Sequence, residues 1–468
     1  MEMENIPDDV LLQVMRYLDV PDLLTCRVVC KRFGILALDP DVWRFRTLTC
    51  RDIQVDPPFG FCDRVEFSEP WMCPVLRLAP CLGTLSVDLP SASAERNLLY
   101  TTTGCAISEL KLFVSRGGTA PAAKVVSNQE SLGRLKSLNL TLIPLESKDD
   151  SDISELLCAA ASTSGLETLD IAVRGCPFNF KLPEAASPRK AVPGALKCFR
   201  CKSGKHPAQL GTFHNIVLAE YAATLEVADL GGDRHDASTA PLLAGMPKLR
   251  WLGCPAVLPG LEAVATCETL TGATIYLKHR KLAEVPGAAE FLRRATQLRE
   301  VTLTYSDDLV LALVSAGPSR VESLTINTEN WMSFELPNHK FLISALPLMP
   351  SLHTLQLDLL TQEFMLAITP DTAPALRTLR LAPAVEEEAF SCAHQFLHWP
   401  EFIAMLRNNP LLVVLVKADR FCFNLGDICE PCHFDFTCHQ EAWIGEIEDA
   451  SIPSGWTKLP RYRRPVRL

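Results

Sequence analysis

The chain has 468 residues, 48% of them hydrophobic, and a formal net charge of −10 at pH 7. This composition allows a large core and argues against general disorder and against a whole-chain nucleic-acid binder, which would show a basic footprint. Neither a secretory signal nor an apolar stretch of about 18 residues is found, so we expect a soluble intracellular protein of the cytoplasm, the nucleus or both. Most of the 18 cysteines are interpreted as buried thiols.

Three short helices are predicted within residues 6–48. The first runs from Val10 to Leu18 with apolar residues at helical spacing, the second begins at Pro21 and the third at Pro40. Helices this short cannot bury their apolar residues among themselves, because a domain below about 40 residues rarely stands alone. The surplus apolar surface therefore predicts an obligate partner.

The segment IPDDVLLQVMRYLDVPDLLTCRVVCKRFGILALDPDVW resembles the F-box family along its whole length. The resemblance is carried by Pro7, Tyr17-Leu18, Asp22-Leu23-Leu24, Val29-Cys30-Lys31, Leu36-Ala37, Asp39-Pro40 and Trp43. Ile6, Met15 and Phe33 differ from the commonest family residues but keep their size and apolar character. The alternative is an unrelated three-helix cap on the rest of the chain.

The resemblance implies that this segment docks onto a Skp-family adaptor, which links such proteins to a cullin scaffold and a RING subunit. It also implies a non-catalytic subunit, because the partners carry out ubiquitin transfer. The adaptor-binding candidates, as direct contacts or as supporting residues, are Pro7, Val10, Leu11, Leu18, Leu23, Leu24, Val29, Cys30 and Trp43.

A six-residue signature recurs after Trp71: an apolar residue, two free positions, an apolar residue, one free position and a third apolar residue. The signatures begin at Leu82, Ile107, Leu135, Leu166, Leu196, Leu225, Leu249, Leu270, Leu298, Val321, Leu352 and Leu376, with a degraded thirteenth at Leu412. Their average spacing of roughly 27–28 residues is typical of long leucine-rich repeats, in which a strand alternates with a helix. Residues 154–162 and 288–295 are examples of the expected helices.

We therefore expect an α/β fold: a short three-helix F-box followed by a leucine-rich-repeat solenoid. The expected solenoid is a horseshoe with parallel strands on its concave face and helices outside. The expected domains are residues 1–49 for the F-box, 50–70 for a linker, 71–420 for about 12–13 irregular repeats and 421–468 for a C-terminal cap and basic tail. Residues 177–194, with four prolines, are an expected loop insertion. An ordinary α/β domain with Leu-rich strands is the alternative, which the phased signatures disfavour.

The motifs of phosphate-binding loops, dinucleotide sites, metalloproteases and serine hydrolases are not found, so we expect no enzyme activity and no cofactor. Six possible metal ligands lie within 18 residues: Cys422, Cys429, Cys432, His433, Cys438 and His439. Only one pair has zinc-type Cys-x-x-Cys spacing, so buried thiols are favoured over structural zinc and no metal is expected. The arginine-rich tail 460–468 is interpreted as solvated and disordered, with a localisation signal or a contact with an acidic partner as the alternatives.

The expected function is the substrate-recognition subunit of a Skp–cullin–F-box type E3 ubiquitin ligase, with an unknown protein target, no membrane and no nucleic acid. The alternatives are a repeat scaffold that binds the adaptor without ubiquitination and a ligand-sensing F-box receptor. The substrate-binding candidates, expected as near neighbours on the concave strand face, are Arg200, Asp229, Trp251 and Tyr276. For Trp251, packing beneath a loop or the C-terminal tail is the alternative.

Overall fold

The computed structural model describes residues 6–50, 71–91, 93–143, 150–174, 195–203, 210–231, 235–277, 285–315, 319–328, 339–358, 360–381, 399–417 and 456–458. The chain divides into two compact units, residues 1–249 (unit 1) and 250–468 (unit 2). Within the described ranges, no helix is both long and apolar enough to cross a membrane.

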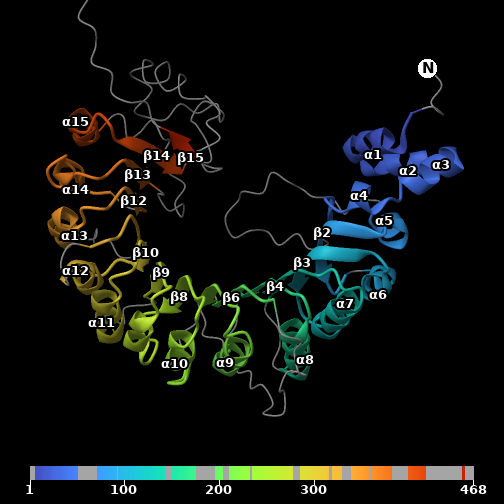
Figure 1. Cartoon of the computed structure of the whole chain (residues 1–468), viewed down its shortest axis with the longest axis horizontal. Coiled ribbons are helices and arrows are strands. Elements are labelled where there is room, and N and C mark those ends of the chain that lie inside the picture. The colour runs from blue at the N-terminus through green and yellow to red at the C-terminus, as the bar shows by residue number, and fades with distance from the viewer. Residues whose placement is uncertain are drawn as a thin grey trace, which may run out of the picture. The chain divides into compact units, whose positions relative to one another are not determined.

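Unit 1 begins with short helices and continues as strands that alternate with helices (Figure 1). Its helices are α1 (Asp8–Tyr17), α2 (Val20–Val29), α3 (Lys31–Leu36), α4 (Pro40–Trp43), α5 (Met72–Leu78), α6 (Ala94–Thr102), α7 (Thr119–Ser131), α8 (Asp150–Ser162), α9 (Gly211–Glu220) and α10 (Thr239–Ala244). Its strands are β1 (Thr47–Cys50), β2 (Cys81–Leu89), β3 (Ala106–Val114), β4 (Ser137–Leu142), β5 (Thr168–Val173), β6 (Cys198–Ser203) and β7 (Val227–Leu230). The helix expected at 154–162 is thus confirmed as α8.

The N-terminal segment contains four helices, so the prediction of three is wrong. Cys30 has an extended backbone (φ −158°, ψ 167°) that ends α2, and its Sγ accepts a hydrogen bond from the Phe33 amide at 3.4 Å, which starts α3. Gly34, which could have ended a helix, lies inside α3. A Cβ at Gly34 would lie 3.0 Å from the carbonyl oxygen of Arg27, so the glycine allows α2 and α3 to approach closely.

The row of strands begins earlier in the chain than the repeated signature predicts. Strand β1 pairs in parallel with β2, with Leu48 opposite Leu85. In the sequence, Phe45, Leu48 and Cys50 carry the same spacing as the repeated signature, which is the signal that could have revealed this strand. The expected linker 50–70 lies outside the described residues except for Cys50, the last residue of β1.

The strands of unit 1 form a parallel sheet in chain order from β1 to β7. The helices after β1 lie on one side of this row (Figure 1). The register aligns the middle apolar residue of each predicted signature, and all of these residues are buried: Leu85, Leu110, Leu138, Leu169, Phe199 and Ala228. Side chains at the free positions between them point to the other face, because successive residues of a strand alternate.

Unit 2 continues the alternation of strands with helical segments. Its strands are β8 (Trp251–Pro255), β9 (Gly272–Tyr276), β10 (Glu300–Thr304), β11 (Ser323–Asn327), β12 (Thr354–Leu357), β13 (Thr378–Leu381), β14 (Val413–Lys417) and β15 (Trp456–Lys458). The helical segments are η3 (Leu261–Thr266), α11 (Pro286–Arg294), α12 (Asp307–Ser315), α13 (Lys340–Ala345), η5 (Leu346–Leu348), α14 (Gln362–Ala367) and α15 (Pro400–Asn408). The helix expected at 288–295 corresponds to α11, and the loop insertion expected at 177–194 lies outside the described residues.

Strands β8 to β14 are parallel and in chain order, and β15 pairs with β14 in the antiparallel direction. The thirteenth signature is misplaced by one residue, because Leu379 lies opposite Val414 rather than Leu415. The sequence LLVVLVK is apolar at almost every position, so alternation cannot fix its register. The antiparallel strand β15 was not predicted.

Candidate functional site

Helix α1 has two apolar sides, and only one of them is covered. Leu11 and Met15 are buried on the side that contacts α3 and α4. Val10, Val14 and Tyr17 follow one another at four- and three-residue spacing and are 45%, 53% and 91% exposed. Residues three and four apart share a face of a helix, so these three side chains form an uncovered stripe.

Helices α2 and α3 add further exposed apolar residues, namely Val28, Val29 and Ile35. These three residues and the stripe on α1 are called the exposed apolar set. Single apolar residues on a surface are ordinary, but this many in so short a segment mark an interaction site. Burial of such side chains against a partner releases about 25 cal/mol per Å² of apolar surface removed from water.

Two arginines hold the helices that carry the exposed apolar set. The Nη2 of Arg46 donates hydrogen bonds to the carbonyl oxygens of Met15 (3.0 Å) and Leu18 (2.7 Å). The last carbonyls of a helix lack intrahelical donors, and a cation near them also interacts favourably with the helix dipole. Arg32 pairs with Asp8 at 2.6 Å and thereby links α3 to the first turn of α1.

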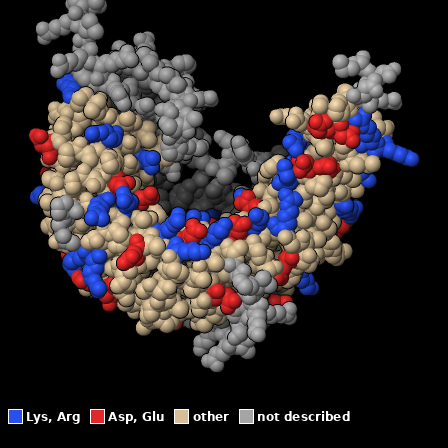
Figure 2. Space-filling model, in the orientation of Figure 1, with Lys and Arg blue, Asp and Glu red and all other residues tan. Residues whose placement is uncertain are grey.

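Charged side chains occupy free positions of β5, β6 and β7 in unit 1. The register places Arg200 opposite Asp170 on one side and opposite Asp229 on the other. Neighbouring strands lie about 4.8 Å apart, so Arg200 stands between two acidic residues. The Nζ of Lys202 lies 3.7 Å from Oδ2 of Asp229. Figure 2 shows basic and acidic side chains side by side on the surface of the molecule.

The other two predicted substrate contacts lie in unit 2, on the adjacent strands β8 and β9. Trp251 is opposite Gly272 and Tyr276 is opposite Pro255, so the two aromatic residues lie at opposite ends of the strand pair. The expectation that they are near neighbours is wrong, because Trp251 precedes the second apolar position of its signature whereas Tyr276 follows the third. Strand pairing within unit 1 therefore brings Arg200 and Asp229 together, whereas pairing within unit 2 keeps Trp251 and Tyr276 apart.

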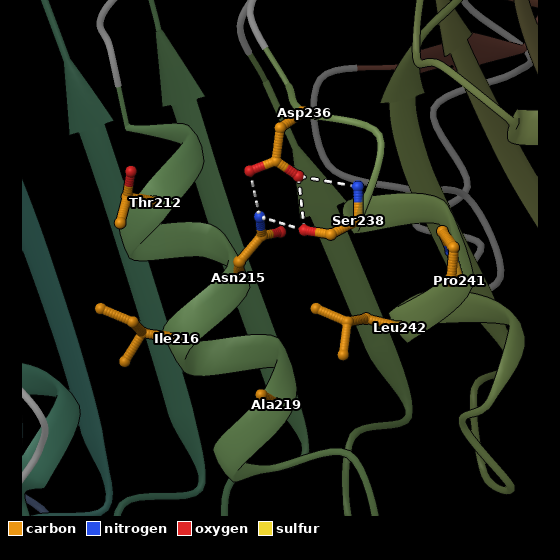
Figure 3. A pocket seen from close by; sticks show the side chains of 8 residues that line it. All are labelled: Thr212, Asn215, Ile216, Ala219, Asp236, Ser238, Pro241 and Leu242. Carbon is orange, nitrogen blue, oxygen red and sulfur yellow. Dashed lines mark hydrogen bonds between the residues drawn. The ribbon is translucent and has the colours of Figure 1, made fainter.

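An open pocket lies between α9 and α10 of unit 1 (Figure 3). Three of its polar residues bind one another: Asn215 donates to Asp236 (2.7 Å) and to the Ser238 hydroxyl (3.0 Å), and Ser238 donates to Asp236. Burial alone would raise the pKa of Asp236, but these hydrogen bonds outweigh it and lower that pKa. The pocket thus offers a ligand chiefly the apolar side chains of Ile216 and Leu242.

Comparison with known proteins identifies the N-terminal segment. The F-box-like family model matches residues 3–49. Residues 3–49 form an F-box-like domain. F-box domains are typically non-catalytic and commonly bind Skp-family adaptors.

The solved structures that resemble the chain include a crystal structure of a TLR13–ssRNA13 complex, at 15% sequence identity and a TM-score of 0.33. That match covers 67% of this chain and 41% of the other, so this chain spans less than half of that structure's length. A search of curated proteins finds no match.

Within the F-box-like domain, the nine predicted adaptor residues occupy three kinds of environment. Pro7, Val10, Val29 and Cys30 are exposed, Leu18 and Leu24 are half-buried, and Leu11, Leu23 and Trp43 are buried. The Trp43 indole donates a hydrogen bond to the carbonyl oxygen of Ala37 at 2.7 Å, which places this side chain inside the domain. The candidates did not include Val14, Tyr17, Val28 and Ile35, although the helical spacing from Val10 pointed to the first two.

The C-terminal cysteine and histidine cluster, Cys422 to His439, lies outside the described residues, as does the basic tail 460–468. In the part of the chain that is described, no group of three or more His, Cys, Asp or Glu side chains has an arrangement that could hold a metal ion. The expectation that the cluster holds no metal therefore stays a prediction.

Proposed function

We propose that this protein is the substrate-recognition subunit of a Skp–cullin–F-box type E3 ubiquitin ligase. The observation that carries the proposal is the exposed apolar set of the F-box-like domain, which would be buried against a Skp-family adaptor. The adaptor would link the chain to a cullin scaffold and a RING subunit. Catalysis would then come from proximity, because a bound target is held near the charged conjugating enzyme at a high effective concentration. We expect this complex in the cytoplasm, the nucleus or both.

The strand–helix units would bind the target protein, as a leucine-rich-repeat solenoid with its strands on a concave face. The regular register of strands β2 to β7 and β8 to β14 supports this proposal. Arg200 and Asp229 remain proposed target contacts of unit 1, and Trp251 and Tyr276 remain proposed contacts of unit 2. Each pair is to be tested separately.

The adaptor part of the proposal is tested by co-expressing the full chain with a Skp-family adaptor and measuring how much adaptor co-purifies. The double variant Val10→Asp/Val29→Asp should lose the adaptor, because two carboxylates cannot be buried in an apolar interface without a large desolvation cost. Its matched control is Leu98→Asp, since Leu98 is also an exposed apolar residue but lies on α6, outside the F-box-like domain. Undiminished adaptor recovery by the double variant would contradict the proposal.

The ligase part is tested by affinity purification from cells under proteasome inhibition, with the wild type and the double variant compared. Cullin should be recovered with the wild type alone, and proteins recovered with both are target candidates. Recovery of adaptor without cullin would favour a scaffold that does not promote ubiquitination.

A further inference from the structure

Strand β6 carries two cations, Arg200 and Lys202, at alternate positions and hence on the same side of the sheet. A third cation, Lys197, lies just before the strand and is already compensated. The carboxylate of Glu167 lies between Lys197 (3.2 Å) and Lys136 (3.0 Å), and hydrogen bonds from both lysines lower its pKa. Arg200 and Lys202 lie beside Asp170 and Asp229 instead, so this cluster on the sheet holds charges of both signs.

Asp229, an acidic neighbour of both cations, is less accessible than Lys202. The side chain of Asp229 is 8% exposed, whereas that of Lys202 is 59% exposed. Burial also raises the pKa of Asp170, an effect that Arg200 and Lys202 oppose. The carboxylates thus form the base of the cluster, and the lysine ammonium group is its outer end.

Small residues flank Lys202 on both sides. Its register partner on β5 is Ala172. On the other side the chain continues from β7 into Gly231, whose amide donates to the carbonyl oxygen of Cys201 at 2.6 Å. Neither Ala172 nor Gly231 reaches as far from the sheet as a lysine, which agrees with the exposure of the Lys202 side chain.

We propose that Arg200 and Lys202 bind an extended, acidic segment of the target protein in which acidic residues alternate with other residues. This inference rests on the proposed function and names the chemistry of its target. Residues two apart on a strand are about 6.6–6.8 Å apart, and so are alternate residues of an extended peptide. A segment that follows β6 therefore brings carboxylates at positions i and i+2 to the two cations. Attraction between these carboxylates and the two cations, of which Lys202 is exposed and Arg200 half-buried, gives both affinity and orientation.

The test uses the full chain in complex with its adaptor and a fluorescein-labelled peptide of alternating Glu and Thr, followed by fluorescence anisotropy. A peptide of the same composition with its Glu residues grouped together tests the spacing. Lys202→Ala should weaken binding of the alternating peptide about fivefold, as expected for loss of an exposed ion pair. Arg200→Gln should weaken it at least as much, and added salt should weaken it further. The matched control is Lys124→Ala, because Lys124 is an exposed lysine on α7.

Lys202 is exposed, so its substitution keeps the test decisive even if Arg200→Gln disturbs the fold. No binding by the wild type, or equal binding by Lys202→Ala, would overturn the proposal. Tighter binding of a labelled oligouridine than of the peptide would also overturn it and indicate a nucleic-acid surface. Adaptor co-purification is measured on every variant, so failure here is distinguishable from failure of the proposed ligase role.

Discussion

The indole ring of Trp251 lies across the backbone of Gly272 on the neighbouring strand. A Cβ built on Gly272 would lie 2.1 Å from Cε3 of Trp251 and 2.5 Å from its Cζ3. The two residues are register partners in β8 and β9. The ring thus packs on the sheet itself and stays half-buried, an arrangement that only a residue without a side chain at position 272 permits.

Gly272→Ala should therefore destabilise unit 2. The added methyl group requires the indole ring or the strands to move, and overpacking of this kind typically costs about 1–3 kcal/mol. Urea unfolding followed by circular dichroism measures the loss, and tryptophan fluorescence reports the displacement of the ring. When Trp251 is also replaced by alanine, Gly272→Ala should lower the free energy of unfolding by less, because the indole ring that the added methyl group meets is absent.

Gly287→Ala is the matched control. Gly287 lies in the first turn of α11, and an added Cβ would have its nearest neighbour, an oxygen of Glu262, at an ordinary 3.6 Å. Alanine also favours a helix by about 1 kcal/mol relative to glycine, so this variant should be as stable as the wild type or more so. Equal stabilities for the variants at 272 and 287 would show that the Trp251 contact imposes no constraint.

Much of the fold could be predicted from the sequence, because the repeated apolar positions define both the strands and their buried side. The middle residues, from Leu85 to Leu379, align in the register as the signature requires within each unit. The predictions that were wrong concern features that the spacing of apolar residues does not determine. The extended backbone of Cys30 divides one predicted helix in two, and the uniformly apolar β14 hides its register.

The candidate site was less predictable, because residue type alone does not tell whether a side chain is buried. Trp43 and Leu23 match the F-box pattern as well as Val29 does, yet they are fully buried while Val29 is exposed. Likewise Tyr276 shares a face with Trp251 but lies four residues further along the strand pair. Distinguishing contacts from supporting residues requires the packing of the helices and strands, which the pattern does not contain.

Two glutamine side chains near helix ends satisfy backbone groups of residues earlier in the chain. Gln129 is fully buried, its Oε1 accepts from the Ile107 amide at 2.9 Å, and its Nε2 donates to the carbonyl oxygen of Cys105 at 3.1 Å. In unit 2, Gln297 donates to the carbonyl oxygens of Ala265 and Cys267. The two glutamines therefore play similar parts in sites of different burial.

Gln129→Met should lower the free energy of unfolding substantially, because it leaves a buried amide and a buried carbonyl unpaired at about 1–3 kcal/mol each. Gln297→Met should cost less, since Gln297 is half-buried and water can replace part of what is lost. Urea unfolding of both variants measures the difference. A larger loss for Gln297→Met than for Gln129→Met would contradict the role of burial.

Arg46→Met should weaken the F-box-like domain and, as a consequence, adaptor binding. It removes the donors to the carbonyl oxygens of Met15 and Leu18, and hydrogen bonds to charged groups contribute about 1.5–3 kcal/mol. Arg44→Met is the control, because exposed Arg44 pairs with Asp41 and stacks on Phe45, contacts worth about 1 kcal/mol or less. Limited proteolysis of the N-terminal segment should be faster for Arg46→Met than for Arg44→Met, and adaptor recovery should be lower. Identical behaviour of the two variants would argue against a stabilising role for the Arg46 hydrogen bonds.

His214 should make unit 1 sensitive to acid. Its ring is buried, stacks on His235 at a centroid distance of 5.1 Å and meets the edge of Phe199 at 5.9 Å. Among the described residues, neither ring nitrogen has a hydrogen-bond partner. Burial, and secondarily the neighbouring His235, lower the pKa of His214 from 6.5 to about 3. Between pH 6.5 and about 3, His214 is therefore neutral in the folded protein but protonated in the unfolded chain.

Because the folded pKa lies below the unfolded one, the unfolded state binds more protons and stability falls as the pH drops from 6.5 toward 3. Between pH 7 and pH 5 this single group should lower the free energy of unfolding by about 2 kcal/mol. His214→Phe keeps a ring among the same aromatic neighbours and should flatten the dependence, whereas substitution of the exposed His353 by Phe should leave it unchanged. Urea midpoints at pH 7 and pH 5 measure the effect. If His214→Phe loses as much stability on acidification as the wild type, the acid sensitivity arises from other groups.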